Sequence, residues 1–224
     1  MKKALTVCMA AMMALTLLAG CKGKDDTYEP VKSGIYVRED GSVVSADVEE
    51  FAESYYDKTE LTGFVEDEIV AYNKKASGMA YAYAEEAKEV DKEAVLPVAL
   101  KGLTVEGQKA VLLLEFATGK DYLDFNGDMN VVLTALAQTT VKEAKEAGKS
   151  MSGLKDAEGA AVDEAKVAKK KNYEYLTLTV AEGLTEAMPV QVQGTIQYVS
   201  GNVTITGENT VTVPAGETAV IIYK

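Results

Sequence analysis

The C-terminal part of the chain alternates apolar and polar residues with a period of two, and this pattern restricts the possible folds more than any other. Leu176, Leu178 and Val180 are separated by two threonines, which is the pattern of a β-strand with one buried face. Turn residues interrupt the alternation several times, and short strands at this spacing predict an antiparallel meander from about residue 173 onward. The alternation continues through Val190, Val192, Ile196, Tyr198, Val203, Ile205, Val211, Val213, Val220 and Ile222.

The N-terminal half combines a predicted hairpin with two predicted helices. Residues 35–37 and 41–44 are predicted to form a hairpin that turns around Glu39-Asp40-Gly41, because Asp-Gly suits a tight hairpin turn. Asp47 followed by Glu50 matches a capping box, so a helix is predicted to begin there. The apolar stripe of this helix consists of Val48, Phe51, Ala52 and Tyr55. A second helix is predicted over residues 60–74, with a buried stripe formed by Leu61, Phe64, Val65, Ile69 and Tyr72.

The middle of the chain is predicted to contain strands, short helices and a charged segment. Residues 95–105 and 109–118 are predicted strands, and Pro97 places the first of them at its start or at a sheet edge. Residues 78–91 hold tyrosines and alanines followed by charges, which predicts a strand and then a loop. Residues 149–171 carry little apolar mass, which predicts a solvated helix or a mobile insertion. Short helices are predicted over residues 120–125 and 140–147.

These elements together predict an α+β fold. Two amphipathic helices would pack on a mostly antiparallel sheet, and the C-terminal meander would complete it. We expect one domain over residues 34–224. The alternative is a subdivision near residue 172, which would make the C-terminal strands a separate β domain.

The first 20 residues have the pattern of a secretory signal peptide. Lys2 and Lys3 precede an apolar run over residues 4–18, which is shorter than the ~20 residues that a spanning helix needs. The run ends in Leu18, Ala19, Gly20 and Cys21. This ending resembles the lipobox of bacterial lipoproteins, in which the cysteine is lipidated and becomes the first residue of the mature chain. An ordinary signal peptide with a chance cysteine is the alternative.

Lipidation of Cys21 would attach the chain to the cell membrane, on the side that faces away from the cytoplasm. Residues 21–33 would then form the lipidated cysteine and a flexible, polar tether. The lipobox implies a diacylglyceryl group, with palmitate as an expected acyl chain, and two acyl chains hold a protein stably at a membrane, whereas one chain binds only marginally. The membrane is therefore the predicted partner, and the contact is made through lipid.

Composition excludes several classes of function. The chain has no histidine and two cysteines, of which Cys8 would leave with the signal peptide and Cys21 would carry lipid. Histidine-based triads and His/Cys zinc sites are therefore excluded. Loss of residues 1–20 removes two lysines and no acidic residue, so the net charge would move from −12 to about −14. Such a charge repels phosphates, and nucleic-acid binding is not expected. The sequence indicates no cofactor.

Two short motifs suggest chemistry, but each is incomplete. Asp124, Asn126 and Asp128 offer oxygen atoms at positions 1, 3 and 5 of an EF-hand-like loop, but Met129 stands where glycine is needed and Ala135 where glutamate is needed. They stay weak candidates for a calcium site, and a helix end followed by an Asn-Gly turn is the favoured interpretation. Ser152-Gly153-Leu154-Lys155 fits the S-x-x-K pattern of penicillin-binding enzymes, but the partner motifs are missing. No catalytic residue is predicted.

Several segments beyond residue 33 carry a resemblance to a known group of proteins. They are Gly34-Ile35-Tyr36-Val37, Asp40-Gly41-Ser42-Val43, Phe51 with Tyr55-Tyr56-Asp57 and Glu60-Leu61, Tyr72-Asn73, Tyr122 with Phe125-Asn126, Tyr198-Val199-Ser200 with Asn202-Val203, and Ile221-Ile222-Tyr223-Lys224. Together with the lipobox they resemble an uncharacterised group of small lipoproteins from Gram-positive gut bacteria. The resemblance implies a lipid anchor and a single unit over residues 34–224, and it carries over no catalytic residue.

Three functional hypotheses remain. The first is a surface-anchored, non-enzymatic lipoprotein that binds a ligand or scaffolds the envelope. The second is a carboxylate-based hydrolase that acts on glycan or cell wall, which two buried or cleft-facing carboxylates with raised pKa values would favour. The third is an assembly subunit that pairs through an exposed strand edge, such as residues 219–223. The ligand, the protein partner and the oligomeric state are not predicted.

Overall fold

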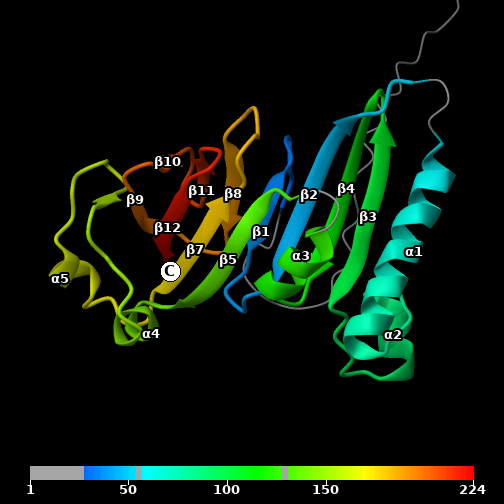
Figure 1. The fold of residues 1–224 in the computed structure, drawn as a ribbon, viewed down its shortest axis with the longest axis horizontal. Coiled ribbons are helices and arrows are strands. Elements are labelled where there is room, and N and C mark those ends of the chain that lie inside the picture. Colours follow the sequence, from blue (N-terminus) through cyan, green and yellow to red (C-terminus); the bar gives the residue numbers. More distant parts are fainter. Residues whose placement is uncertain (1–27, 54–56, 128–130) are drawn as a thin grey trace, which may run out of the picture.

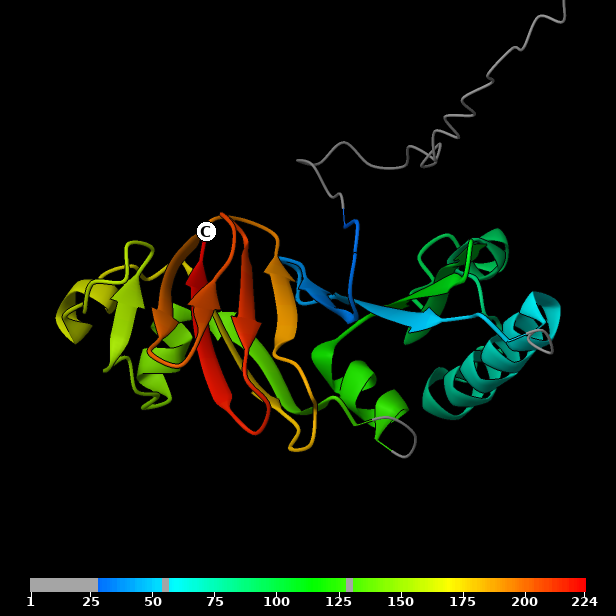
Figure 2. The same cartoon turned by 90° about the horizontal axis from the view of Figure 1, so that it is seen from above.

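The computed structural model describes residues 28–53, 57–127 and 131–224, which form an α+β fold with five helices and two mostly antiparallel sheets (Figure 1). Figures 1 and 2 both show an elongated molecule, with α5 (Glu164–Val167) near one end and α1 (Lys58–Ser77) near the other. The α+β class predicted from the sequence is therefore correct.

The larger sheet combines strands from both ends of the described chain. Its seven strands, in spatial order, are β10 (Thr204–Ile205), β11 (Thr210–Val213), β8 (Met188–Val192), β1 (Gly34–Val37), β2 (Val43–Glu50), β4 (Lys109–Phe116) and β3 (Val98–Glu106). β1 pairs antiparallel with β2, which confirms the predicted hairpin, and Gly41 occupies the turn with φ +85°. On its other side β1 pairs parallel with β8. Pro97 immediately precedes β3 at the sheet edge, as predicted.

The smaller sheet is formed mostly by the C-terminal half. Its five strands, in spatial order, are β5 (Leu133–Thr140), β7 (Glu174–Val180), β12 (Thr218–Tyr223), β9 (Ile196–Ser200) and β6 (Leu154–Asp156). The predicted strands after residue 173 are present, but the predicted simple meander is wrong. β8, β10 and β11 belong to the larger sheet, because their apolar faces find partners beside β1 rather than beside β7.

The main hydrophobic core lies between the two sheets. β1 and β8 contribute fully buried residues from the larger sheet, and β7 and β12 contribute them from the smaller one. Burial of branched aliphatic side chains on this scale, at roughly 25 cal/mol per Å² of apolar surface, is the dominant stabilising contribution. Its fully buried members include Ile35, Val37, Val190, Val192, Leu176, Leu178, Ile221 and Tyr223.

A second core covers the opposite face of the smaller sheet. Met151, Leu154 and Val167 pack there against Tyr175 and other residues of the sheet. Residues 149–171, expected to be a solvated helix or a mobile insertion, instead form β6 and α5, because these three apolar side chains are enough to anchor the segment. α4 (Val141–Glu146) confirms the helix predicted over 140–147 and begins with a capping box.

α1 and α2 (Ala84–Val90) lie at the other end of the molecule, and α1 confirms the helix predicted over 60–74. Val65 and Ile69 are buried as predicted, whereas Phe64 is 56% exposed. Asn73 is fully buried and joins α1 to the start of β3, because its amide donates to the Val98 carbonyl at 2.7 Å and accepts from the Val98 N–H at 3.0 Å.

Two other expectations are wrong. Over residues 47–53 the helix predicted to start at Asp47 is absent, since residues 43–50 pair with β4 along their whole length as β2, and Tyr55 lies outside the described residues. Residues 78–91, predicted as strand and loop, contain α2, whose Ala87 packs against Leu96 and Ala99 of the adjacent β3 region. The short helix predicted over 120–125 is α3 (Gly119–Asn126).

Candidate functional site

A cavity of about 620 Å³ lies beside the end of β2. β1 begins at Gly34, opposite Ala46, so residues 47–50 of β2 extend beyond it. The loop that leads into β8 forms the opposite wall, and α3 contributes Tyr122. We call this cavity the β2 pocket. Its lining residues are Val31, Lys32, Ser33, Gly34, residues 45–50, Lys109, Tyr122, Val132 and residues 184–189.

The segment before β1 forms one rim of the β2 pocket. The Ser33 hydroxyl accepts a hydrogen bond from the Val48 N–H at 2.9 Å and donates one to the Val48 carbonyl at 3.3 Å. The side chain of the residue before β1 thus continues the hydrogen bonding between β1 and β2. The Lys32 ammonium pairs with the Glu186 carboxylate at 2.6 Å. Residues 32 and 33, expected to belong to a flexible tether, are therefore fastened to the fold.

Asp47 is the unusual residue of the β2 pocket. Its side chain was expected to cap a helix, but on β2 it is partly buried and lines the cavity. Among the described residues it forms no hydrogen bond and no ion pair. Burial, and secondarily the negative charge of Glu49, raise the pKa of the Asp47 carboxyl above its ordinary value. A carboxylate in this condition is destabilising unless a donor reaches it.

Tyr122 supplies a second polar group to the same cavity. Its side chain is 3% exposed, and its hydroxyl has no hydrogen-bond partner within the described part of the chain. Burial, followed by the charge of Asp47, raises the pKa of Tyr122, so the phenol stays protonated at neutral pH. The β2 pocket thus places a carboxyl and a phenol, neither with a hydrogen-bond partner among the described residues, within a lining of mixed polar and apolar side chains. Its volume is typical of small-molecule sites.

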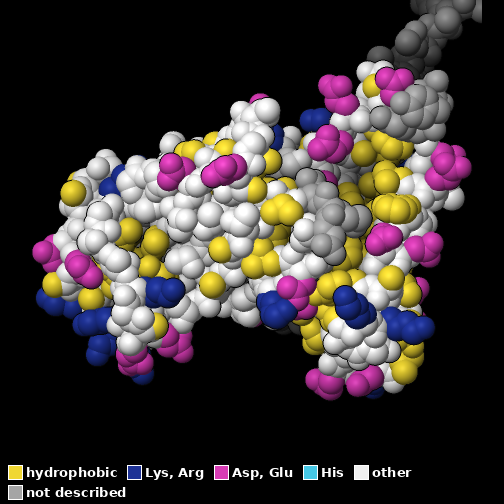
Figure 3. Space-filling model, in the orientation of Figure 1, with side chains coloured by type: hydrophobic (Ala, Val, Ile, Leu, Met, Phe, Trp, Pro, Cys, Tyr) yellow, Lys and Arg dark blue, Asp and Glu magenta, His cyan; other side chains and the backbone are white. Residues whose placement is uncertain are grey.

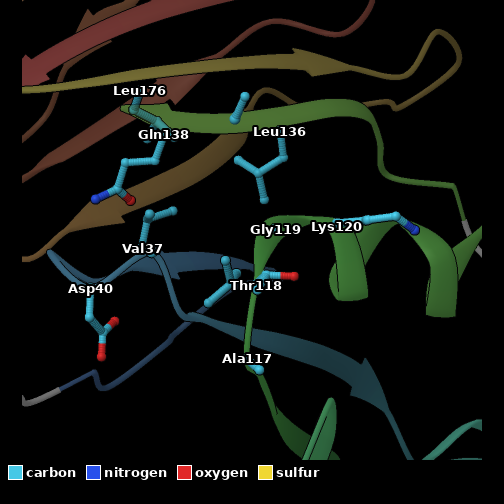
Figure 4. Close-up of a pocket in the computed structure, with 12 residues that line it drawn as sticks. Val37, Asp40, Ala117, Thr118, Gly119, Lys120, Leu136, Gln138 and Leu176 are labelled. Carbon is cyan, nitrogen blue, oxygen red and sulfur yellow. The ribbon is translucent and has the colours of Figure 1, made fainter. Parts of the chain in front are cut away.

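A smaller cavity of about 270 Å³ lies between the β1–β2 turn, the start of α3 and β5 (Figure 4). The Gln138 amide donates to the Glu39 carbonyl at 3.0 Å and to the Glu174 carboxylate at 3.1 Å, while its buried Oε1 has no partner among the described residues. The charged groups at its mouth are engaged elsewhere. Asp40 accepts from Ser42, and Lys120 extends away from the cavity and pairs with Asp124. This cavity is therefore the weaker candidate.

The weak calcium candidates do not converge. Asp124 pairs with Lys120, the Asn126 amide donates to the Tyr122 carbonyl at 2.8 Å, and Asp128 lies outside the described residues. In the parts of the chain that the structure describes, no group of three or more acidic residues is placed to hold a metal ion. Leu18, Ala19, Gly20 and Cys21 also lie outside the described residues.

The remaining motifs have structural roles. The Ser152 hydroxyl lies 2.8 Å from that of Ser150, and the Lys155 ammonium donates to the Gly201 carbonyl at 3.1 Å, so the S-x-x-K residues are not paired with each other. Residues 219–223 are the strand edge that the third functional hypothesis requires to be exposed. That expectation is wrong, because β12 has β7 on one side and β9 on the other.

The β2 pocket was missed because residues 47–55 also fit the spacing of a helix. The β-branched residues Val43, Val44 and Val48 were the available signal for a strand. The sequence pattern could not indicate the opposite wall of the β2 pocket, because that wall is formed by the loop at residues 184–189, more than 130 residues farther along the chain.

No family model, curated protein or solved structure matches this chain. The resemblance to small lipoproteins therefore stays a prediction. Over the described residues, no helix has both the length and the hydropathy required to cross a bilayer.

Proposed function

We propose that this chain is a lipid-anchored protein of the bacterial envelope that binds a small ligand in the β2 pocket without transforming it. One observation carries the binding proposal. The Asp47 carboxyl lines a cavity of about 620 Å³, and no described residue supplies it with a hydrogen bond. A group that destabilises the folded state is commonly retained because it has a function. A ligand that donates a hydrogen bond to the Asp47 carboxyl would offset the free-energy cost of leaving it unpaired.

The lipobox-like residues 18–21 support the anchor. Six residues lie between Cys21 and Tyr28, and the seven Cα–Cα steps from one to the other span at most about 25 Å. The pocket rim at residues 31–34 would therefore stay close to the membrane surface. Labelling of growing bacteria with a palmitate analogue should mark the wild-type protein and the Cys8→Ser control. The Cys21→Ser variant should stay unlabelled, and labelled Cys21→Ser protein would contradict the anchor.

Ligand binding is tested with residues 22–224, which lack Cys21. We expect a thermal shift in a screen of cell-wall fragments, glycans and short peptides. A ligand at 100 times its Kd stabilises the folded state by about 2.7 kcal/mol. Ala187 is exposed and lines the pocket, so Ala187→Trp should fill it and abolish the shift. Ala135→Trp, at an exposed position outside the pocket, should preserve it. A shift that survives in Ala187→Trp would contradict the β2 pocket as the site.

A carboxylate-based hydrolase is the second candidate. Asp47 and Glu49 lie two residues apart on one strand, so their side chains share a face. The raised pKa of Asp47 suits a general acid, and Glu49 would then be the base or the nucleophile. Release of reducing sugar from cell-wall polysaccharide by the wild type, and loss of at least ~100-fold of that rate in Asp47→Asn, would favour this function over simple binding.

We also propose that residues 34–224 act as one folding unit. The pairing of β8 with β1 supports this, because it joins a strand from beyond residue 172 to the N-terminal hairpin.

A further inference from the structure

The β2 pocket is lined by more acidic than basic side chains. Four acidic side chains and two lysines line it, and Lys32 already pairs with Glu186. Asp47, Glu49 and Glu50 remain against the single ammonium of Lys109. Figure 3 shows acidic side chains gathered around this end of β2 and β4 and over α1. A concave site concentrates the negative electrostatic potential of the acidic side chains that line it, so the pocket attracts positive charge.

The local geometry of Asp47 points in the same direction. Its carboxyl has a like-charged neighbour, Glu49, and no donor among the described residues. A neutral hydroxyl could supply a hydrogen bond, but it would leave the negative charge uncompensated in a partly buried site. A cationic donor supplies both the hydrogen bond and the compensating charge. The unpartnered hydroxyl of Tyr122 offers a further oxygen acceptor in the same cavity.

The size of the site and the character of its walls favour an organic cation over a metal ion. Within the described residues, no three acidic groups are placed to coordinate a metal. The cavity is also far larger than an ion, and its mixed lining includes walls formed by the apolar side chains of Val132, Leu184 and Met188.

We infer that the ligand of the β2 pocket is an organic cation, whose ammonium or guanidinium group pairs with the Asp47 carboxylate while its apolar part packs against these walls. This inference rests on the proposed binding function and specifies the chemical class of the ligand.

Matched sets of compounds test the inference. One set is phenethylamine, 2-phenylethanol and phenylacetate, and a second is hexylamine, hexanol and hexanoate. Each is titrated into ¹⁵N-labelled protein, residues 22–224, and affinities are taken from the amide signals of residues 45–50 and 184–188. We expect the amine to bind at least tenfold more tightly than the alcohol, and the carboxylate not to bind.

Two variants separate a direct contact with Asp47 from general attraction by an acidic protein. Asp47→Asn should reduce the preference for the amine to less than threefold. Asp67→Asn removes one negative charge from an exposed position of α1 and should leave the preference unchanged. Tyr122→Phe should weaken amine binding a few-fold while the preference remains.

A measurement on the wild-type protein removes the dependence on variants. Amine binding should lower the pKa of the Asp47 carboxyl, followed by ¹³C NMR, and alcohol binding should not. Equal affinities of amine and alcohol in the β2 pocket would overturn the cation inference but leave the proposed binding function in place. If no compound of either set perturbed the pocket signals, the cation inference would likewise be overturned, whereas the binding function itself is overturned by the thermal-shift screen and the Ala187→Trp variant.

Discussion

At the scale of single residues, Asp47 makes the pH dependence of stability testable. Its raised pKa means that the folded protein holds this proton more tightly than the unfolded chain does. Between the ordinary value of 3.8 and the raised value, the folded state therefore binds more protons, and stability falls as pH rises through that interval. We expect Asp47→Asn to raise Tm at pH 7 and to flatten this decline.

Thermal unfolding of both proteins between pH 3.5 and pH 8 measures the effect. The two Tm values should converge at the acid end, where the wild-type carboxyl is neutral as well. Asp67→Asn, at an exposed position of α1, is the matched control and should follow the wild-type profile. A Tm of Asp47→Asn below that of the wild type at pH 7 would show that the carboxylate stabilises the folded state, and would contradict its assignment as an unpaired, destabilising group.

Asn73 is a buried polar residue whose side chain forms three hydrogen bonds to the backbone. It donates to the carbonyls of Tyr81 and Val98 and accepts from the Val98 N–H, with no exposure to solvent. Asn73→Ala would leave these buried backbone groups unpaired and should lower the free energy of unfolding by about 3 kcal/mol. Lys75→Ala, on the exposed side of the same helix, should change it by less than about 0.5 kcal/mol. Urea denaturation measures both, and equal effects would refute the role of Asn73.

At the scale of elements, the parallel contact between β1 and β8 depends on a glycine. A Cβ atom at Gly34 would lie 2.6 Å from the Pro189 carbonyl oxygen. Gly34→Ala should therefore separate the two strands and cost about 1–3 kcal/mol. Gly63→Ala provides the contrast, because that position within α1 has open space around it. It should stabilise the protein by about 0.5–1 kcal/mol. Chemical denaturation of the two variants should give opposite signs, and a neutral Gly34→Ala would mean that β8 can shift.

At the scale of the whole molecule, the strands beyond residue 172 complete both sheets. β8 and β11 extend the larger sheet past β1, while β7, β9 and β12 form the centre of the smaller one. We expect residues 28–172 and residues 173–224 each to be unfolded when expressed alone, whereas residues 28–224 unfold in one cooperative transition. Circular dichroism and amide NMR dispersion measure this. A folded 173–224 fragment would instead support a division near residue 172.

The sequence by itself determined those parts of the fold that depend on neighbours along the chain. Asp40-Gly41 is a turn because glycine reaches φ +85° without strain. Thr140 and Glu143 cap α4 because each side chain bonds to the backbone N–H of the other residue. The alternation from Tyr175 to Val180 predicted a half-buried strand correctly, since side chains of a strand point to opposite faces.

Tertiary structure decided the remaining features of the fold and the site, because these features depend on partners that are distant in sequence. Residues 47–55 fit the spacing of a helix, but β4 supplies an edge that pairs with all eight residues of β2. The alternating pattern predicted strands but carried no information on which sheet each would join. The β2 pocket exists only where residues 31–34, 45–50 and 184–189 meet. Asp47 therefore acquired its unpaired carboxyl and raised pKa from the folded environment, and no local sequence pattern specifies that environment.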